Sequence, residues 1–156
     1  MPWRTTKGLE RIGKLDERFG QSGKPTIARF APTSSLPATR GRHLGKDPNV
    51  ERYDPDLWTD EFNFLSQPGQ GDIQTELFYD YRTNVEAYPK WQAWMREHKP
   101  RLLVIWGKYD GSFDISEPEA YRRDVPNAEV HVLDAGHFAL DTAADEIAAL
   151  VRAFMR

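Results

Sequence analysis

Two apolar segments, one on each side of a helix-like stretch, constrain the fold of this chain more than any other feature. The first, RLLVIWG (residues 101–107), is a continuous apolar run of the kind found in strands that are buried on both faces. The second, AEVHVLDAG (residues 128–136), has Val130, Val132 and Leu133 as candidate inward-facing residues. Because a helix between two strands carries the chain back across a sheet, this order predicts an α/β fold with parallel strands.

Two helices are predicted in this region from their capping signals. SEPEAYRRDV (residues 116–125) places Ser116 and Glu119 at capping-box spacing, between the two strands. TAADEIAALVRAFMR (residues 142–156) does the same with Thr142 and Asp145, and its apolar residues recur at helical spacing. Residues 100–156 therefore read as strand, helix, strand, helix.

One carboxylate and one imidazole follow the two predicted strands. Asp110 lies just after the first strand and His137 just after the second. The carboxyl ends of parallel strands meet at one edge of a sheet, where ligands of α/β folds bind. Taken singly, Asp110 is explained as a turn former and His137 as a polar loop residue. Taken as a pair, they predict a catalytic acid that orients a histidine base through its Nδ1 proton.

Residues 47–99 have a different composition, dominated by aromatic and acidic side chains. GDIQTELFYDYRTNVEAY (residues 71–88) predicts an amphipathic helix with Asp72 as its N-cap. YPKWQAWMREHK (residues 88–99) predicts a second helix with Pro89 in its first turn. This segment is expected to be helical throughout most of its length.

Residues 1–46 are rich in Gly, Pro, Ser and Thr after a possible short helix at 8–20, and contain a weak strand candidate at 25–31. They are predicted to be a poorly ordered leader or one unrelated to the rest. Residues 1–50 hold ten Lys and Arg against four Asp and Glu, a net of +6, and the remainder has a net of −9. The positive charges are scattered, so we predict no nucleic-acid partner.

Several chemistries are excluded or disfavoured by composition. The chain has no cysteine, which rules out disulfides, thiolate catalysis and cysteine-ligated zinc. No spacing of His, Asp and Glu suggests a metal site, and no cofactor is predicted. No apolar run approaches the ~20 residues of a membrane helix, and no signal peptide is visible. We therefore predict no membrane association and a cytoplasmic location.

The segments RLLVIWGKYDGSF, AEVHVLDAGHFALD and IAALVRAFM resemble the C-terminal part of an α/β-hydrolase, of the haloalkane dehalogenase and epoxide hydrolase branch. In that family a nucleophile comes first, then an acid after a late strand, then a histidine after the last strand. Asp110 corresponds to the acid and His137 to the histidine. Residues 47–99 are similar to the helical cap that covers the pocket, which divides the chain into 1–46, 47–99 and 100–156.

The resemblance is incomplete at the point where the family places its nucleophile. No G-x-S-x-G elbow, nor its Asp equivalent, stands on a strand-to-helix turn, and Gly111 occupies a position where Pro is expected. Two parallel strands are also too few for an independent sheet of ordinary stability. We therefore expect a truncated hydrolase that is inactive alone.

The resemblance implies hydrolysis through a covalent intermediate, with a small apolar epoxide, haloalkane or ester as substrate. It also implies a set of substrate-binding side chains, with core packing as the alternative role for each cap aromatic. These are Phe138, Trp58, Phe78, Tyr79, Tyr81 and Trp91. Two alternatives remain open, namely one half of a split enzyme that a partner chain completes and a non-enzymatic binding module.

Overall fold

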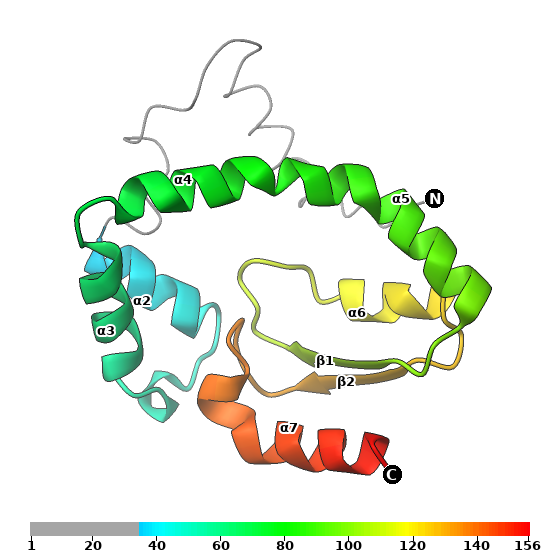
Figure 1. Ribbon diagram of the computed structural model, residues 1–156. Coiled ribbons are helices and arrows are strands. Elements are labelled where there is room, and N and C mark those ends of the chain that lie inside the picture. The colour runs from blue at the N-terminus through cyan, green and yellow to red at the C-terminus, as the bar shows by residue number, and fades with distance from the viewer. Residues whose placement is uncertain (1–34) are drawn as a thin grey trace.

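The computed structural model describes residues 35–156, so the predicted short helix at 8–20 and the strand candidate at 25–31 lie outside the described residues. The described part consists mainly of helices around a small sheet (Figure 1). Its helices are α2 (Leu36–Leu44), α3 (Asp56–Leu65), α4 (Gln70–Asp80), α5 (Arg82–His98), α6 (Glu117–Ala120) and α7 (Leu140–Phe154). Its 3₁₀ turns are η2 (Val50–Arg52) and η3 (Tyr121–Arg123), and its strands are β1 (Leu103–Gly107) and β2 (Glu129–Leu133).

The sheet consists of β1 and β2, which pair in parallel within the described residues and confirm the predicted α/β arrangement. Leu103 pairs with Glu129 and Gly107 pairs with Leu133, so both strands end at the same rung. In Figure 1, α6 lies on one side of this sheet and α7 on the other. The carboxyl ends of both strands therefore open onto one shared edge.

The contact between the sheet and α7 forms one of two small apolar cores. Its fully buried members come from β2, the following loop and the first turn of α7, and partly buried residues of β1 and α7 surround them. The buried residues are Leu133, Ala135 and Ala143, and those packed on them are Ile105, Ala139, Ile147 and Leu150.

The prediction for the inward face of β2 was wrong at one position. Val132 is 46% exposed, whereas Leu133 is only 4% exposed. Successive strand residues point to opposite faces, and α7 covers the face that carries Leu133. The face that carries Val132 is not covered to the same extent.

Helix α2 was not predicted, because the composition of residues 21–45 favours a loop. Ser35 caps the helix by accepting a hydrogen bond from the Ala38 amide, and Pro37 lies in the first turn. The helix packs on α3, where Leu44, Tyr53 and Trp58 form the second apolar core with Leu57 against them. Tertiary packing thus stabilises a helix whose local sequence is unfavourable.

Helices α4 and α5 form one continuous arch over the sheet (Figure 1). The break between them is at Tyr81, not near residue 88 as predicted, and Pro89 lies inside α5 rather than in a first turn. At the break the Thr83 hydroxyl donates to the Asp80 carbonyl and the Asn84 amide donates to the Tyr81 carbonyl. These local bonds lie at the junction of the two helices.

Three helices lack the capping hydrogen bonds that the sequence predicted. α4 begins at Gln70 after Gly69, so Asp72 lies in the first turn and is not the N-cap. Ser116 is the N-cap of α6, as predicted, but its side chain makes no capping hydrogen bond. The Glu117 carboxylate instead accepts from the Asp114 amide.

Helix α7 begins at Leu140 without a side-chain cap, two residues before the predicted Thr142. Its backbone departs from helical geometry at Ala143, with φ −133° and ψ 27°. This kink separates a first turn that follows the His137 loop from the longer amphipathic part that covers the sheet.

None of the helices between residues 35 and 156 combines the length and apolar composition needed to cross a bilayer.

Candidate active site

The loop after β1 holds Asp110 through a set of backbone hydrogen bonds. The amides of Lys108 and Tyr109 donate to the carbonyls of Leu133 and Ala135, which extends the pairing of the two strands beyond the sheet. Asp110 Oδ1 then accepts from the amides of Ser112 (2.6 Å) and Phe113 (3.0 Å). The turn at Asp110, which the sequence predicted, therefore also holds the Asp110 carboxylate in a fixed orientation.

The loop after β2 reaches the same place by close backbone packing. Ala135 is fully buried, and Gly136 follows it. A β-carbon built on Gly107 would be 1.9 Å from the Gly136 carbonyl oxygen, so the end of β1 and the histidine loop are in direct contact. Only glycine at position 107 permits this approach. The close contact places His137 near the loop that contains Asp110.

Asp110 and His137 are in hydrogen-bond contact, with Asp110 Oδ2 and His137 Nδ1 2.9 Å apart. The Asp110 side chain is 7% exposed and that of His137 is 25% exposed. Burial raises the pKa of Asp110, but hydrogen bonds from His137 and from the Phe113 and Ser112 amides outweigh it, and the net shift is downward. An ionised Asp110 accepts a hydrogen bond from Nδ1 when that nitrogen carries the ring proton, and Nε2 is then the nitrogen with a free lone pair.

The imidazole of His137 lies between two phenyl rings. Its ring centroid is 5.5 Å from that of Phe113 and 4.8 Å from that of Phe138. Within residues 35–156, no hydrogen bond involves His137 Nε2. The partly exposed His137 side chain therefore lies in an aromatic environment.

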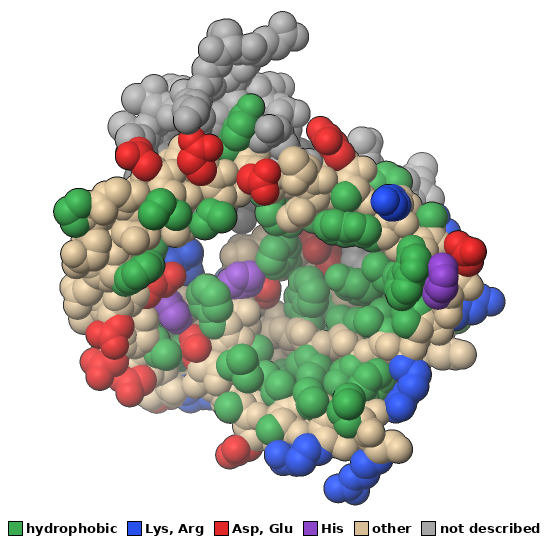
Figure 2. Space-filling model, in the orientation of Figure 1, with side chains coloured by type: hydrophobic (Ala, Val, Ile, Leu, Met, Phe, Trp, Pro, Cys, Tyr) green, Lys and Arg blue, Asp and Glu red, His purple; other side chains and the backbone are tan. Residues whose placement is uncertain are grey.

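An opening lies beneath the α4 part of the arch, and hydrophobic side chains gather between the α5 part and the sheet (Figure 2). The β strands point toward this region with their carboxyl ends in Figure 1. The arrangement thus has the general form of a site at a sheet edge beneath a helical cover.

The sequence of this chain matches a known protein family. Residues 16–144 match the family model described as the alpha/beta hydrolase fold. The chain belongs to the α/β-hydrolase family. In this family an acid and a histidine follow late strands in that order, as Asp110 and His137 do here.

Three curated hydrolases are similar in sequence. The chain is 43% identical to an uncharacterized hydrolase of Saccharomyces cerevisiae over 95 residues, which cover 61% of this chain and 33% of the yeast protein. It is 26% identical over 160 residues to a 2-hydroxy-6-oxononadienedioate/2-hydroxy-6-oxononatrienedioate hydrolase of Burkholderia vietnamiensis, covering 94% of this chain and 55% of that protein. The protein of the same name from Paraburkholderia phymatum is 28% identical over 146 residues, with 83% and 49% covered.

The hydrolase-family chain spans between a third and somewhat more than half of the length of these relatives. The similarity therefore assigns the family and does not assign an activity or a substrate to this chain.

The aromatic residues that were predicted to bind substrate lie in three different environments. Phe138 contacts His137 directly, and its substrate-binding role stays a prediction. Trp58 is 8% exposed and belongs to the α2–α3 core, where it also contacts the ring of His43. Core packing therefore describes the surroundings of Trp58.

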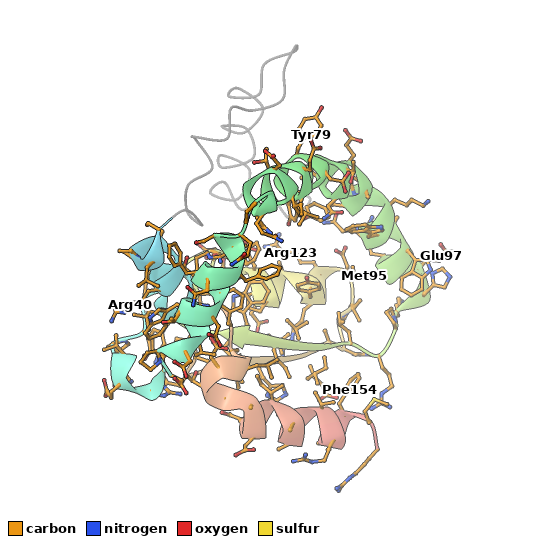
Figure 3. All side chains as sticks on the ribbon, turned by 60° about the vertical axis from the view of Figure 1, so that its left-hand side comes forward. Arg40, Tyr79, Met95, Glu97, Arg123 and Phe154 are labelled. Atoms are coloured by element: carbon orange, nitrogen blue, oxygen red, sulfur yellow. The ribbon has the colours of Figure 1, made fainter. Side chains whose placement is uncertain are left out.

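The remaining aromatic candidates lie on the α4–α5 arch. Tyr79 is on the outer side of α4, away from the sheet (Figure 3). The Tyr81 hydroxyl is 2.8 Å from that of Tyr88, whose ring contacts Trp91 edge-on. The side chain of Phe78 lies outside the described part of the structure. The substrate-binding roles of this group stay predictions.

Two residues near His137 were missed by the sequence analysis. Phe113 contributes both a ring beside His137 and an amide to Asp110. His43 is 7% exposed and contacts Phe138, although its surroundings in the sequence are polar. The proximity of Phe113 to Asp110 in the sequence was a usable signal, whereas nothing local indicates the burial of His43.

No group of three or more His, Asp or Glu side chains in the described range is arranged to hold a metal ion.

Proposed function

We propose that Asp110 and His137 are the acid and the base of a hydrolase that acts through a covalent intermediate. The observation that carries this proposal is the 2.9 Å contact between Asp110 Oδ2 and His137 Nδ1, with Nε2 unengaged by residues 35–156. A nucleophile from polypeptide outside this sequence first attacks the substrate and forms an ester with it. In that step the bond to the leaving group breaks, which releases the halide of a haloalkane or the alcohol of an ester, or opens an epoxide ring whose oxygen takes a proton from water. A water molecule then attacks the ester while His137 Nε2 takes its proton, and His137 returns this proton to the departing oxygen as the ester C–O bond breaks.

The role of Asp110 in this step is to fix the ring and to stabilise the imidazolium that forms. Its downward-shifted pKa keeps the carboxylate ionised at neutral pH. A buried carboxylate beside Nδ1 favours the charged ring after proton transfer, which lowers the barrier to attack by water.

The proposed substrate is a small uncharged electrophile, namely an epoxide, haloalkane or ester, in line with the epoxide hydrolase and haloalkane dehalogenase branch. The support is the aromatic environment of His137, where Phe113 and Phe138 provide apolar contacts. A second candidate is a 2-hydroxy-6-oxo-dienedioate, because the two hydrolases named for such compounds align with most of this chain. A dianionic substrate needs basic partners at the site, and these aromatic contacts therefore favour the uncharged class.

The test compares the chain alone with the chain joined to the polypeptide encoded upstream of it. We expect no turnover of a p-nitrophenyl ester, an epoxide or a dienedioate by the 156-residue chain. The longer protein, if it supplies a nucleophile elbow, hydrolyses one of these, and His137→Gln lowers kcat by about 100-fold or more.

His98→Gln is the matched control, since His98 lies at the end of α5 and hydrogen-bonds the Trp94 carbonyl. It leaves turnover unchanged. Turnover that survives His137→Gln, or equal loss in both variants, contradicts the proposal. Activity of the short chain that requires His137 contradicts the expectation that the nucleophile lies elsewhere.

A further inference from the structure

His43 is a buried histidine whose two ring nitrogens both face carboxylates. Its Nδ1 is 2.8 Å from Asp141 Oδ2 and its Nε2 is 3.0 Å from Glu61 Oε2. The His43 side chain is 9% exposed, and those of Asp141 and Glu61 are 14% and 28% exposed.

The charges around His43 come from each helix packed against it. Asp141 lies in α7 and Glu61 in α3, and Arg42 of α2 pairs with the other oxygen of Glu61. A single side chain of α2 thereby joins two helices that are far apart in sequence. Charge-assisted hydrogen bonds in a largely buried position are the stronger kind, and each of these fixes a ring orientation.

The hydrogen bonds of His43 lead through Asp141 to the segment that contains His137. The Asp141 amide donates to the Phe138 carbonyl, so the Asp141 side chain is held one turn from the Phe138 ring. That ring packs between the two imidazoles, with centroids 4.7 Å from His43 and 4.8 Å from His137. Rotation of His43 therefore cannot occur without displacing Phe138 or breaking the Asp141 bond.

The backbone after His43 contacts both loops of the candidate active site. The Lys46 amide donates to the Tyr109 carbonyl, next to Asp110. The His43 carbonyl oxygen lies 2.8 Å from where a β-carbon on Gly136 would be, next to His137. Residues 43–46 thus contact both the loop after β1, which carries Asp110, and the loop after β2, which carries His137.

We propose that His43 is a positioning residue for His137, which locks the Phe138 ring and the start of α7 so that His137 stays on Asp110. It acts on the pair through Phe138 and Asp141 and does not itself contact a substrate. The inference rests on the proposed function only for its catalytic consequence, because the placement of His137 is measurable without turnover.

The test is the tautomer of His137, measured by long-range ¹H–¹⁵N NMR at a pH where its ring is neutral. The chain has only four histidines, so each ring is assignable by single substitution. In the wild-type chain the Nδ1–H tautomer dominates because that proton is donated to Asp110. His43→Gln lowers the ratio of Nδ1–H to Nε2–H tautomers severalfold, whereas His98→Gln leaves it unchanged.

A second variant is needed in case His43→Gln does not fold, which far-UV circular dichroism will show. Asp141→Asn keeps the side-chain volume, removes the carboxylate that faces His43 Nδ1, and lowers the same ratio. A folded His43→Gln protein with the wild-type ratio overturns the proposal, and if that variant does not fold, an unchanged ratio in Asp141→Asn overturns it.

The catalytic consequence is a separate measurement in the longer protein. There His43→Gln lowers kcat and leaves KM unchanged, because it misplaces the base without touching the substrate. Absence of any turnover, together with a dominant Nδ1–H tautomer of His137, contradicts the proposed function and leaves the positioning role of His43 intact.

Discussion

Asp110 makes three hydrogen bonds through its two carboxylate oxygens. It accepts two backbone amides through Oδ1 and the His137 proton through Oδ2, while its side chain is only 7% exposed. Asn in its place retains an acceptor for the amides but turns an N–H₂ group toward His137. The expected result is an unfavourable contact at Nδ1 and a reversed tautomer of the ring.

We expect Asp110→Asn to lower the free energy of unfolding by about 1–3 kcal/mol at neutral pH. The pKa of Asp110 is lowered in the folded state from its ordinary 3.8. Its contribution is therefore fully present above the unfolded pKa and is lost as pH falls through the lower folded value. Urea unfolding of both proteins between about pH 3 and pH 7 measures this, and the difference narrows below about pH 4. A difference that stays constant over this range contradicts the assignment.

Gly107 is the residue at which the two loops approach most closely. An alanine β-carbon there would be 1.9 Å from the Gly136 carbonyl oxygen and 2.7 Å from that of Ala135. Both neighbours are backbone atoms, so relief requires movement of the histidine loop. We expect Gly107→Ala to reduce the free energy of unfolding by about 2 kcal/mol or more, measured by urea titration.

Gly41 provides the matched control, since it lies inside α2 and a β-carbon there meets nothing within 4 Å. Gly41→Ala is expected to stabilise the protein by up to about 1 kcal/mol, because alanine is the better helix former. Equal effects of the two substitutions would show that the loop contact does not constrain position 107.

The sequence predicted the Asp110–His137 pair because each residue follows a strand that is recognisable on its own. The crossover rule then places the two strand ends together without knowledge of any side-chain contact. His43 was not predictable in this way, because its partner Asp141 lies 98 residues away and its helix has no strong local signal. Long-range polar contacts of this kind arise from the fold and leave no periodic pattern.

Among the elements, α5 carries a proline that its position does not favour. Pro89 is exposed and lies in the eighth position of the 17-residue helix, where it cannot donate to the Val85 carbonyl. We expect Pro89→Ala to raise the free energy of unfolding by about 1–2 kcal/mol, since the restored hydrogen bond exceeds the entropy that proline removes from the unfolded chain.

Pro37→Ala serves as the comparison, because Pro37 is exposed in the first turn of α2, where helix amides lack intrahelical acceptors. It should be neutral or slightly destabilising in the same urea titration. A loss of stability in Pro89→Ala would mean that the proline is required for the shape of the α4–α5 arch.

Element type was easier to predict than element boundaries. Both strands were found because their apolar runs are bounded by polar and glycine residues. The start of α4 was misplaced, because Gly69 with φ 84° turns the chain into the helix before Asp72 is reached. α2 was missed altogether because its stability depends on packing against α3.

At the scale of the whole molecule, the described residues form two small apolar cores rather than one. One lies between the sheet and α7, and the other lies between α2 and α3. Large apolar side chains remain exposed on several elements, including Val132 on β2, Leu140 on α7 and Trp94 on α5. The prediction that two parallel strands are too few for an independent sheet of ordinary stability stays a prediction.

The shared last rung of β1 and β2 has a consequence for misfolding. If β2 slipped by one residue along β1, Leu133 would leave the α7 face and His137 would depart from the sheet toward the opposite side. The hydrogen bond to Asp110 can therefore form only when the strands are aligned in their native frame. A spectroscopic signal from that single bond would report correct assembly of the sheet, even in a chain that turns over nothing.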